Sequence, residues 1–307
     1  MAVKRPPVVP GDGRDPLDDV RARLERIETA LDQLQRTDQL VQAVARRLML
    51  EGVELPPRKQ LRAHRFGVTS QNGEDGLLLE LFRRIGVVDR RFVEIGCGTN
   101  GGNSGFLAQE LGWSGLMVDG NPGAVSKVAL KFVSEDVRAE CHLVSRETIN
   151  PIIDAAGLRG EIDLLSIDID GNDFWVWDAA TVVNPRVVVI EYNYLLGATA
   201  SVTIPYDPEF RLPKAPTRAY RGASLEAMVR LGRRKGYRLV SSERVNAVFL
   251  RKDIESDLPT LTAVEAYQAP GNRGRDVFRK IAGHDLPLVP VDEDGQPGEP
   301  VSAERVR

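Results

Sequence analysis

Short apolar runs alternate with longer helical stretches between residues 91 and 191, and this alternation constrains the fold more than any other feature. The runs that predict strands are Arg91–Ile95, Gly115–Asp119, Glu140–Val144, Ile162–Asp168 and Arg186–Glu191. The stretches that predict helices are Asn103–Leu111, Ala124–Val133, Arg146–Ala156 and Phe174–Thr181. Alternation of this kind predicts an α/β fold, with a parallel sheet covered by helices on both faces.

The pattern changes after residue 191. Residues 192–221 are irregular and rich in proline and aromatic residues. A predicted helix over Ala223–Lys235 follows, and then two runs, Tyr237–Ser242 and Asn246–Arg251, that can form an antiparallel pair. Long irregular segments inside compact domains are usually functional, so 192–221 is a candidate ligand-binding surface. Its aromatic residues, which can stack on sugar rings or simply pack the loop, are Tyr192, Tyr194, Tyr206, Phe210 and Tyr220.

The N-terminal region carries a different, heptad pattern. Apolar residues recur at alternating steps of three and four, at Leu17, Val20, Leu24, Ile27, Leu31, Leu34, Val41 and Leu48. Asp38 and Ala45 interrupt one of the two seams. The pattern predicts a coiled-coil helix over 16–50 through which the chain forms a homo-oligomer. The alternative is a long amphipathic helix packed on its own domain.

Composition sets the remaining boundaries. Residues 1–15 and 286–307 are rich in Pro, Gly and charge and are expected to be disordered, which leaves 51–285 as one domain. The 41 Lys and Arg against 44 Asp and Glu give net −3, which disfavours general nucleic-acid binding. No apolar run is long enough to span a bilayer and no secretory signal is evident, so we expect a cytoplasmic protein. Two cysteines exclude a disulfide framework.

A glycine-rich loop follows the first strand of the alternating region, in Phe92-Val-Glu-Ile-Gly-Cys-Gly-Thr-Asn-Gly-Gly102. Gly96, Gly98 and Gly101 have the G-x-G-x-x-G spacing of dinucleotide sites. Glu94 argues for another ligand, because a carboxylate repels a pyrophosphate and suits a cation. S-adenosylmethionine carries a positive amino group and a positive sulfonium. A nicotinamide dinucleotide, or a glycine turn that serves only packing, remains the alternative.

Asp119 ends the next strand, in Gly115-Leu-Met-Val-Asp-Gly-Asn-Pro122. Its offset from Gly96 is close to the ~20 residues that separate the glycine loop from the ribose-binding acid in such folds. A carboxylate at this place can accept both ribose hydroxyls. Glu94 and Asp119 together therefore favour S-adenosylmethionine.

Several motifs together resemble class I S-adenosylmethionine-dependent methyltransferases, and within them an FkbM-like group. These are Ser70-Gln-Asn-Gly-Glu-Asp-Gly76, Val93-Glu-Ile-Gly, Trp113-Ser-Gly-Leu-Met-Val-Asp, Ser166-Ile-Asp-Ile-Asp-Gly-Asn-Asp173, Tyr220-Arg-Gly-Ala-Ser-Leu and Asn246-Ala-Val-Phe-Leu-Arg. The resemblance covers about residues 60–255. It implies a Rossmann-like, seven-stranded, mostly parallel sheet that ends in the antiparallel pair. It also implies methyl transfer, usually to oxygen, with sugars and polysaccharides as common acceptors.

The resemblance also suggests roles for individual residues. Glu94 would hold the methionine amino group, Gly96 and Gly98 would lie along the cofactor, and Asp119 would bind the ribose with Asn121 nearby. The adenine would lie near Ser145. Further cofactor-binding candidates are Gln71, Asn100 and Asp168. The segment Ser70–Asp75 is expected to form a lid over the cofactor or, alternatively, a capped turn that enters a helix.

Acidic residues follow two strands where open α/β sheets bind their ligands. One strand delivers Asp168, Asp170 and Asp173, and the other delivers Glu191 and Asn193. Asp168 or Glu191 can act as the base that takes a proton from an acceptor hydroxyl. Alternatively, Asp168, Glu191 and Asn193 can hold Mg²⁺, as in certain antibiotic-sugar O-methyltransferases. In a third interpretation these acids cap helices, as Asp173 would, or pair with arginines.

His142 completes the catalytic candidates with Asp168 and Glu191, although a buried structural role is the default expectation for it. The sequence thus favours an S-adenosylmethionine-dependent O-methyltransferase that acts on a sugar or glycan hydroxyl. Two alternatives stay open. One is a methyltransferase for another small-molecule acceptor, and the other is a non-catalytic binding module scaffolded by its coiled coil.

Overall fold

The computed structural model describes residues 16–49, 53–214, 217–268 and 277–306. Its α-helices are α1 (Pro16–Met49), α2 (Glu74–Ile85), α3 (Gly105–Leu111), α4 (Pro122–Lys131), α5 (Ile149–Ala155), α6 (Asp173–Ala179), α7 (Leu225–Arg234), α8 (Ala263–Ala266) and α9 (Val277–Ala282). Its strands are β1 (Arg91–Ile95), β2 (Ser114–Asp119), β3 (Val137–Cys141), β4 (Gly160–Ile167), β5 (Val183–Glu191), β6 (Val202–Thr203), β7 (Tyr237–Glu243), β8 (Asn246–Arg251), β9 (Pro287–Pro290) and β10 (Val301–Ser302). Short 3₁₀ turns are η1 (Pro57–Lys59), η2 (Arg62–His64), η3 (Tyr194–Leu196), η4 (Thr217–Ala219) and η6 (Ala303–Val306). The predicted disorder of residues 1–15 lies outside the described residues.

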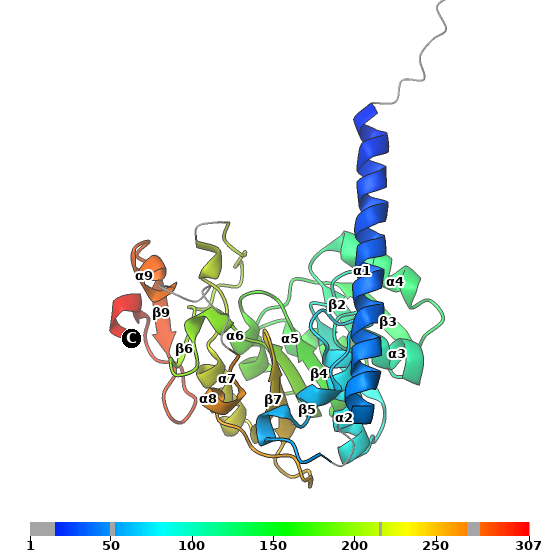
Figure 1. Ribbon diagram of the computed structural model, residues 1–307. Coiled ribbons are helices and arrows are strands. Elements are labelled where there is room, and N and C mark those ends of the chain that lie inside the picture. Colours follow the sequence, from blue (N-terminus) through cyan, green and yellow to red (C-terminus); the bar gives the residue numbers. More distant parts are fainter. Residues whose placement is uncertain (1–15, 50–52, 215–216, 269–276, 307) are drawn as a thin grey trace, which may run out of the picture.

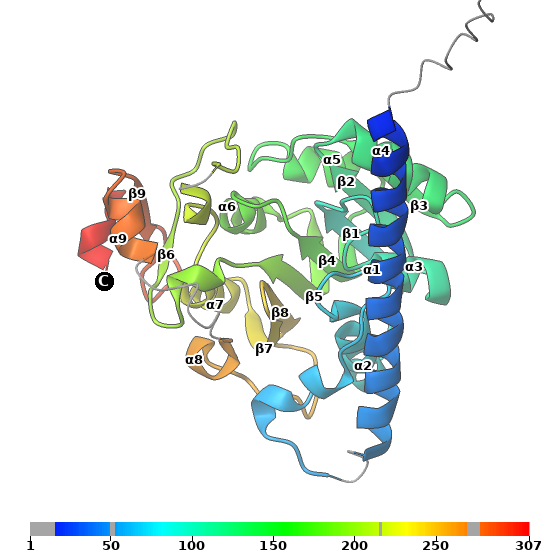
Figure 2. The same ribbon diagram turned by 45° about the horizontal axis from the view of Figure 1, so that its top comes forward.

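Seven strands form the central sheet in the order β3-β2-β1-β4-β5-β8-β7. Strands β1 to β5 pair in parallel, and β8 runs antiparallel to both β5 and β7. Helices lie on both faces of this sheet (Figures 1 and 2). The predicted Rossmann-like, mostly parallel sheet with a C-terminal antiparallel pair is therefore confirmed.

Two apolar clusters cover the two faces of the sheet. One joins α5, α6 and α7 to the sheet and contains the fully buried side chains of Phe174 and Trp177. The other joins α2, α3 and α4 to the opposite face and contains Leu77, Leu107 and Phe132. Because both faces are covered, the central strands are apolar in both directions, and this explains their continuous β-branched runs.

The chain order reverses beside β1, which pairs with β2 on one side and with β4 on the other. Connections that leave in opposite directions open a crevice at the carboxyl ends of these strands. Gly96 and Asp168 follow β1 and β4 directly, and the Asp168 N–H donates to the Ile95 carbonyl at 2.8 Å. The topology thus brings the glycine loop and the predicted acidic residues to the same point.

The predicted disordered tail is wrong over its described part, residues 286–306. Strand β9 pairs with β6 and with β10, and these three strands form a second, antiparallel sheet. Leu288 is fully buried there among residues of β6 and α9. Two of the four prolines of the segment, Pro287 and Pro290, are the end residues of β9, and Leu288 and Val289 between them are buried.

Helix α1 confirms the helix expected over 16–50. The apolar seam residues from Val20 to Leu48 are exposed, from 50% at Val20 to 68% at Leu48, and the contacts of α1 with the domain include the turn η2. In Figure 1 its N-terminal part extends beyond the domain. The helix therefore does not bury its described seam against its own domain. Among the described residues, no helix combines the length and apolarity that crossing a membrane requires.

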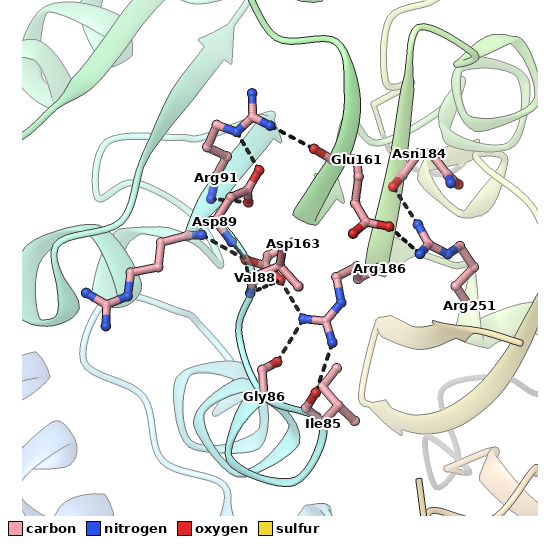
Figure 3. A network of polar contacts seen from close by, with 11 residues as sticks. Ile85, Gly86, Val88, Asp89, Arg91, Glu161, Asp163, Asn184, Arg186 and Arg251 are labelled. Atoms are coloured by element: carbon pink, nitrogen blue, oxygen red, sulfur yellow. Dashed lines mark hydrogen bonds and ion pairs between the residues drawn. The ribbon is translucent and has the colours of Figure 1, made fainter. Parts of the chain in front are cut away.

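A buried ion pair closes the amino end of the sheet (Figure 3). Arg186 of β5 donates to Asp163 of β4 at 2.7 Å and to the carbonyls of Ile85 and Gly86, where α2 ends. Asp163 also accepts the backbone N–H groups of residues 88, 89 and 90, at 2.8 to 3.1 Å. The pair thus anchors the end of α2 and the chain entering β1 to two central strands.

Candidate functional site

Two compartments lie at the carboxyl end of the sheet and share Gly96 and Asp168. The larger has a volume of about 410 Å³ and the smaller about 40 Å³. The larger is lined by residues that follow β1 to β4 and by the segment 208–212. The smaller lies between the glycine loop and the segment 69–72. A ligand that occupied both would pass Gly96 and Asp168 at the junction.

The glycine loop needs glycine for two physical reasons. Gly96 has a φ of +88°, and a Cβ there would overlap the Asp168 carbonyl oxygen. A Cβ on Gly102 would overlap the Glu94 carboxylate. Gly98, with a φ of +56°, donates its N–H to Asp119 at 2.9 Å. Glycines are therefore required here because the loop backbone passes close to Glu94 of β1 and to Asp168 after β4.

Glu94 is completely buried beneath this loop and lines the smaller compartment. Its carboxylate accepts the N–H groups of Asn103 and Ser104 and the hydroxyls of Ser104 and Ser166, at 2.5 to 3.2 Å. Burial raises the pKa of Glu94 to about 7 against these hydrogen bonds. Its oxygens thus hold the loop, a role that the sequence prediction of an ammonium contact did not include.

Asp119 and Asn121 both line the larger compartment. The two oxygens of Asp119 accept the N–H groups of Gly98 and Asn121, at 2.9 and 2.8 Å. Asn121 caps α4 by accepting the Gly123 N–H at 2.9 Å. These bonds fix the Asp119 carboxylate at the end of β2, and each oxygen keeps a second lone pair for a ligand.

The segment Ser70–Asp75 is both a capped turn and a wall of the site. Asp75 accepts the N–H groups of Val68 and Thr69 at 2.6 and 2.8 Å, and Ser70 accepts the Asp75 N–H in return. Gln71 lies in the wall of the smaller compartment. Asn100 lies there too, and its side chain donates to the Thr69 carbonyl, which joins the turn to the glycine loop.

The acids after β4 and β5 form one electrostatic cluster. Burial, followed by the charges of Asp173 and Asp170, raises the pKa of Asp168 to about 8. Burial and the Asp168 charge raise the pKa of Glu191 well above its usual value. Asp173 is not the cap of α6, since its carboxylate accepts the N–H groups of Ile169 and Gly171 and so braces the turn after β4. Burial and mutual repulsion thus disfavour the charged forms of Asp168 and Glu191, and a cation placed among these carboxyl groups would relieve that repulsion.

Arg221 is a charged member of the site to which the sequence analysis gave no role. It forms ion pairs with Asp170 and with Glu191, the second at 3.4 Å. It belongs to the motif Tyr220-Arg-Gly-Ala-Ser-Leu, but nothing in the local pattern connects it with acids 30 and 51 residues away. Only the fold reveals that this guanidinium partly neutralises the cluster.

The predicted Mg²⁺ ligand set does not fit the structure. The Asn193 oxygen accepts the Leu195 N–H at 3.1 Å, and its amide nitrogen donates to two backbone carbonyls. Glu191 is paired with Arg221. Within the described part of the chain, no group of three or more His, Cys, Asp and Glu residues is arranged to hold a metal ion. We therefore assign no chemistry to a metal here.

Two further predictions need correction. His142 is exposed rather than buried, and its ring contacts Glu140 at 2.9 Å. It follows β3 directly and lines the larger compartment, as Asp168 does. Ser145 contacts Thr148 before α5 and is not among the residues that line the larger compartment, where Leu143 and Val144 are found instead. The strand β3 ends at Cys141 rather than at the predicted Val144, so His142 and Ser145 lie in the segment between β3 and α5.

The segment 208–212 forms part of the wall of the larger compartment. Phe210 lines the compartment and packs against Gly171, where a Cβ would overlap its ring. Asn172 donates to the Asp207 carbonyl at 2.7 Å, whereas its own buried oxygen has no hydrogen-bond partner. Of the other predicted aromatics, Tyr192 is buried in the core and Tyr220 donates to the Pro287 carbonyl. Packing therefore explains these two, and Phe210 alone of the five lines the compartment.

Comparison with known proteins adds little to this geometry. No family model matches the chain, and no curated protein matches its sequence. A crystal structure of an S-adenosylmethionine-dependent methyltransferase from Clostridium acetobutylicum is 13% identical, covers 63% of this chain and 95% of its own, and has a TM-score of 0.38. TehB from Haemophilus influenzae is 12% identical over 59% of this chain and 64% of its own, with a TM-score of 0.33. The functional argument therefore depends on the site itself.

Proposed function

We propose that the protein is an S-adenosylmethionine-dependent O-methyltransferase. The observation that carries this proposal is the pair of unequal compartments joined at Gly96 and Asp168. The larger has the size of a small-molecule pocket and can take an uncharged nucleoside. The smaller suits a compact charged group, and buried acids surround the junction. S-adenosylmethionine has this distribution of size and charge, with its sulfonium between the two ends.

The same acids argue against a nicotinamide dinucleotide. Glu94, Asp119 and Asp168 all line the two compartments, and a pyrophosphate placed beside them would be repelled. In our proposal Asp119 accepts the two ribose hydroxyls, and Leu143, Val144 and Phe210 enclose the adenine. Gly96 and Gly98 allow the ligand to approach the backbone closely.

Methyl transfer to oxygen needs an aligned acceptor and a place for its proton. The bound sulfonium supplies the methyl group and a good leaving group, so alignment contributes much of the rate. As the acceptor oxygen forms its bond to the methyl carbon and the S–C bond breaks, the hydroxyl proton passes to a carboxylate. Asp168 suits this role because a base with a pKa of about 8 is well matched to neutral pH, and Glu191 is the second candidate.

We further propose that the acceptor is a hydroxyl-rich molecule, such as a sugar or glycan. The motifs shared with the FkbM-like group support this class, and the carboxylates of Asp170 and Glu191 can accept hydrogen bonds from neighbouring hydroxyls. Arg221 would limit the negative charge that faces the acceptor.

Transfer of a labelled methyl group to fractionated glycans and glycosylated metabolites from the source cell tests this function. We expect label in a hydroxyl-bearing product and at least a ~100-fold lower rate for Asp168→Asn, since general-base catalysis contributes about 10²–10⁴-fold. Glu161→Gln is the matched control, because Glu161 is an exposed acid at the opposite end of the same strand. Label in a lipid or phenol fraction would contradict the proposed sugar or glycan acceptor. No transfer to any fraction would contradict the proposed methyltransferase activity.

We also propose that α1 pairs with α1 of a second copy of this chain. Seven described seam residues expose half or more of their surface, among them Leu31 and Leu34. A helix of 34 residues is about 51 Å long, and such an apolar stripe is stabilised by a partner helix with the same repeat.

Leu34→Glu should reduce the mass measured by light scattering to that of one chain, because it places a charge in the seam. Leu40→Glu introduces the same change on the same helix outside the seam and should leave the mass unchanged. Equal masses for the wild type and both variants would contradict the pairing.

A further inference from the structure

Asn246 carries a buried polar atom that the protein itself does not satisfy. It is the first residue of β8, it is 3% exposed, and it lines the smaller compartment. Its amide nitrogen donates to Glu74 at 2.8 Å, whereas its carbonyl oxygen has no hydrogen-bond partner. A buried acceptor without a donor is costly, so its presence in the wall of a compartment points to a ligand that supplies the donor.

Glu74 determines which end of the Asn246 amide remains available. One Glu74 oxygen accepts the Asn246 amide nitrogen, and the other accepts the Asn72 N–H at 2.9 Å. Both Glu74 oxygens therefore accept from N–H donors, and the NH₂ end of Asn246 faces Glu74 while its carbonyl oxygen points away. Glu74 is completely buried at the start of α2, so it fixes Asn246 and the wall segment 69–72 together.

The sequence suggested Glu94 as the acceptor for the ammonium group, but its carboxylate has little capacity left to accept a hydrogen bond from a ligand. Its carboxylate already accepts hydrogen bonds from two backbone N–H groups and two hydroxyls. These donors use the four positions at which a carboxylate accepts well. Asn246 is therefore an acceptor in the smaller compartment whose capacity is unused.

We infer that the Asn246 carbonyl oxygen accepts a hydrogen bond from the α-ammonium group of the methionine part of S-adenosylmethionine, and that Glu74 is a positioning residue for Asn246. This inference rests on the proposed function. It assigns the small compartment to the amino-acid part of the cofactor. Asp168, which lines both compartments, then lies between the ammonium and the nucleoside.

Two commercially available probes separate this contact from the rest of the site. S-adenosylhomocysteine carries the amino-acid part, and 5′-methylthioadenosine has the same nucleoside and sulfur without it. Calorimetric titration of Asn246→Leu should show about 10-fold or weaker binding of S-adenosylhomocysteine, because hydrogen bonds to charged groups are strong. Binding of 5′-methylthioadenosine should change less than about twofold.

Ser241→Ala is the control, since Ser241 is also buried with an unpartnered oxygen but does not line either compartment. It should change neither affinity. Glu74→Gln, which loosens the orientation of the Asn246 amide, should give a smaller loss confined to S-adenosylhomocysteine and provides a second variant if Asn246→Leu folds poorly.

Unchanged binding of S-adenosylhomocysteine to both Asn246→Leu and Glu74→Gln, or an equal loss for both probes, would overturn the assignment of Asn246 and leave the proposed function standing. Failure of the wild-type protein to bind either probe would overturn the proposed function and this inference with it.

Discussion

Asp163 lies in the amino-terminal half of β4 and Asp168 directly follows its carboxyl end, and the two carboxyl groups have opposite electrostatic surroundings. Burial alone would raise the pKa of Asp163, but the hydrogen bond from Arg186 and three backbone N–H groups lower it below its usual value. Burial and neighbouring acids instead raise the pKa of Asp168 to about 8. Asp163 thus has its hydrogen-bond partners within the protein, whereas the acids near Asp168 repel one another.

We infer from this difference that Asp163 serves the stability of the fold and Asp168 serves ligand binding. The network of Figure 3 connects α2, β1, β4 and β5, and its polar groups form hydrogen bonds and ion pairs with one another. The acids after β4 and β5 crowd together, with Arg221 to compensate them in part. Sites that bind ligands commonly keep such unfavourable electrostatics, because the ligand relieves them.

Breaking the amino-end pair should have the largest effect. Arg186→Leu leaves the Asp163 carboxylate buried without its cation, which costs about 3–5 kcal/mol of the free energy of unfolding. Asp168→Asn should leave that free energy unchanged or raise it, because it removes a carboxylate that burial and neighbouring acids disfavour. Denaturant unfolding of both variants measures the contrast.

Arg91→Leu is the control for the first variant, since the Arg91–Asp89 ion pair of the same region is only partly buried, and its loss should cost about 1 kcal/mol or less. If Asp168→Asn proved as destabilising as Arg186→Leu, both ends of β4 would be structural and the contrast would fail.

A smaller effect is expected on the pH dependence of binding. Since the pKa of Asp168 is about 8, its carboxyl group is mostly neutral below that pH and gains its charge as the pH rises. The affinity for S-adenosylmethionine, relative to that for uncharged-sulfur S-adenosylhomocysteine, should therefore increase about tenfold between about pH 6.5 and about pH 8.

Calorimetric titration at the two pH values measures this ratio. Asp168→Asn should make the ratio independent of pH, whereas Glu161→Gln should behave as the wild type does. A wild-type ratio that does not change with pH would show that the sulfonium does not lie near Asp168.

The sequence predicted the sheet well because its signals are local. Periodic apolar runs, the glycine spacing and the acid ending β2 each describe one segment, and the topology of α/β folds joins them. It predicted the partners of charged groups poorly. That the Asn193 amide donates to the carbonyls of Ala219 and Arg221, that Arg221 pairs with Asp170, and that Glu74 orients Asn246 all depend on residues distant in the sequence.

Boundaries also limited the sequence prediction. An edge strand such as β3 has few neighbours to fix its register, and its start was placed three residues too late, which gave Ser145 a place in the site that it does not have. The segment 286–306 was misjudged from its prolines and acids, although Leu288 and Val289 between them are buried.

We propose that the carboxyl end of this sheet binds S-adenosylmethionine rather than a dinucleotide, and equilibrium titration distinguishes the two ligands. We expect S-adenosylhomocysteine to bind the wild-type protein at one site per chain. Asp119→Ala should weaken that binding about 10-fold or more, because the ribose hydroxyls lose a charged acceptor. NAD⁺ and NADH should not compete. Competition by either dinucleotide, or an Asp119→Ala variant that binds as tightly as the wild type, would contradict the account.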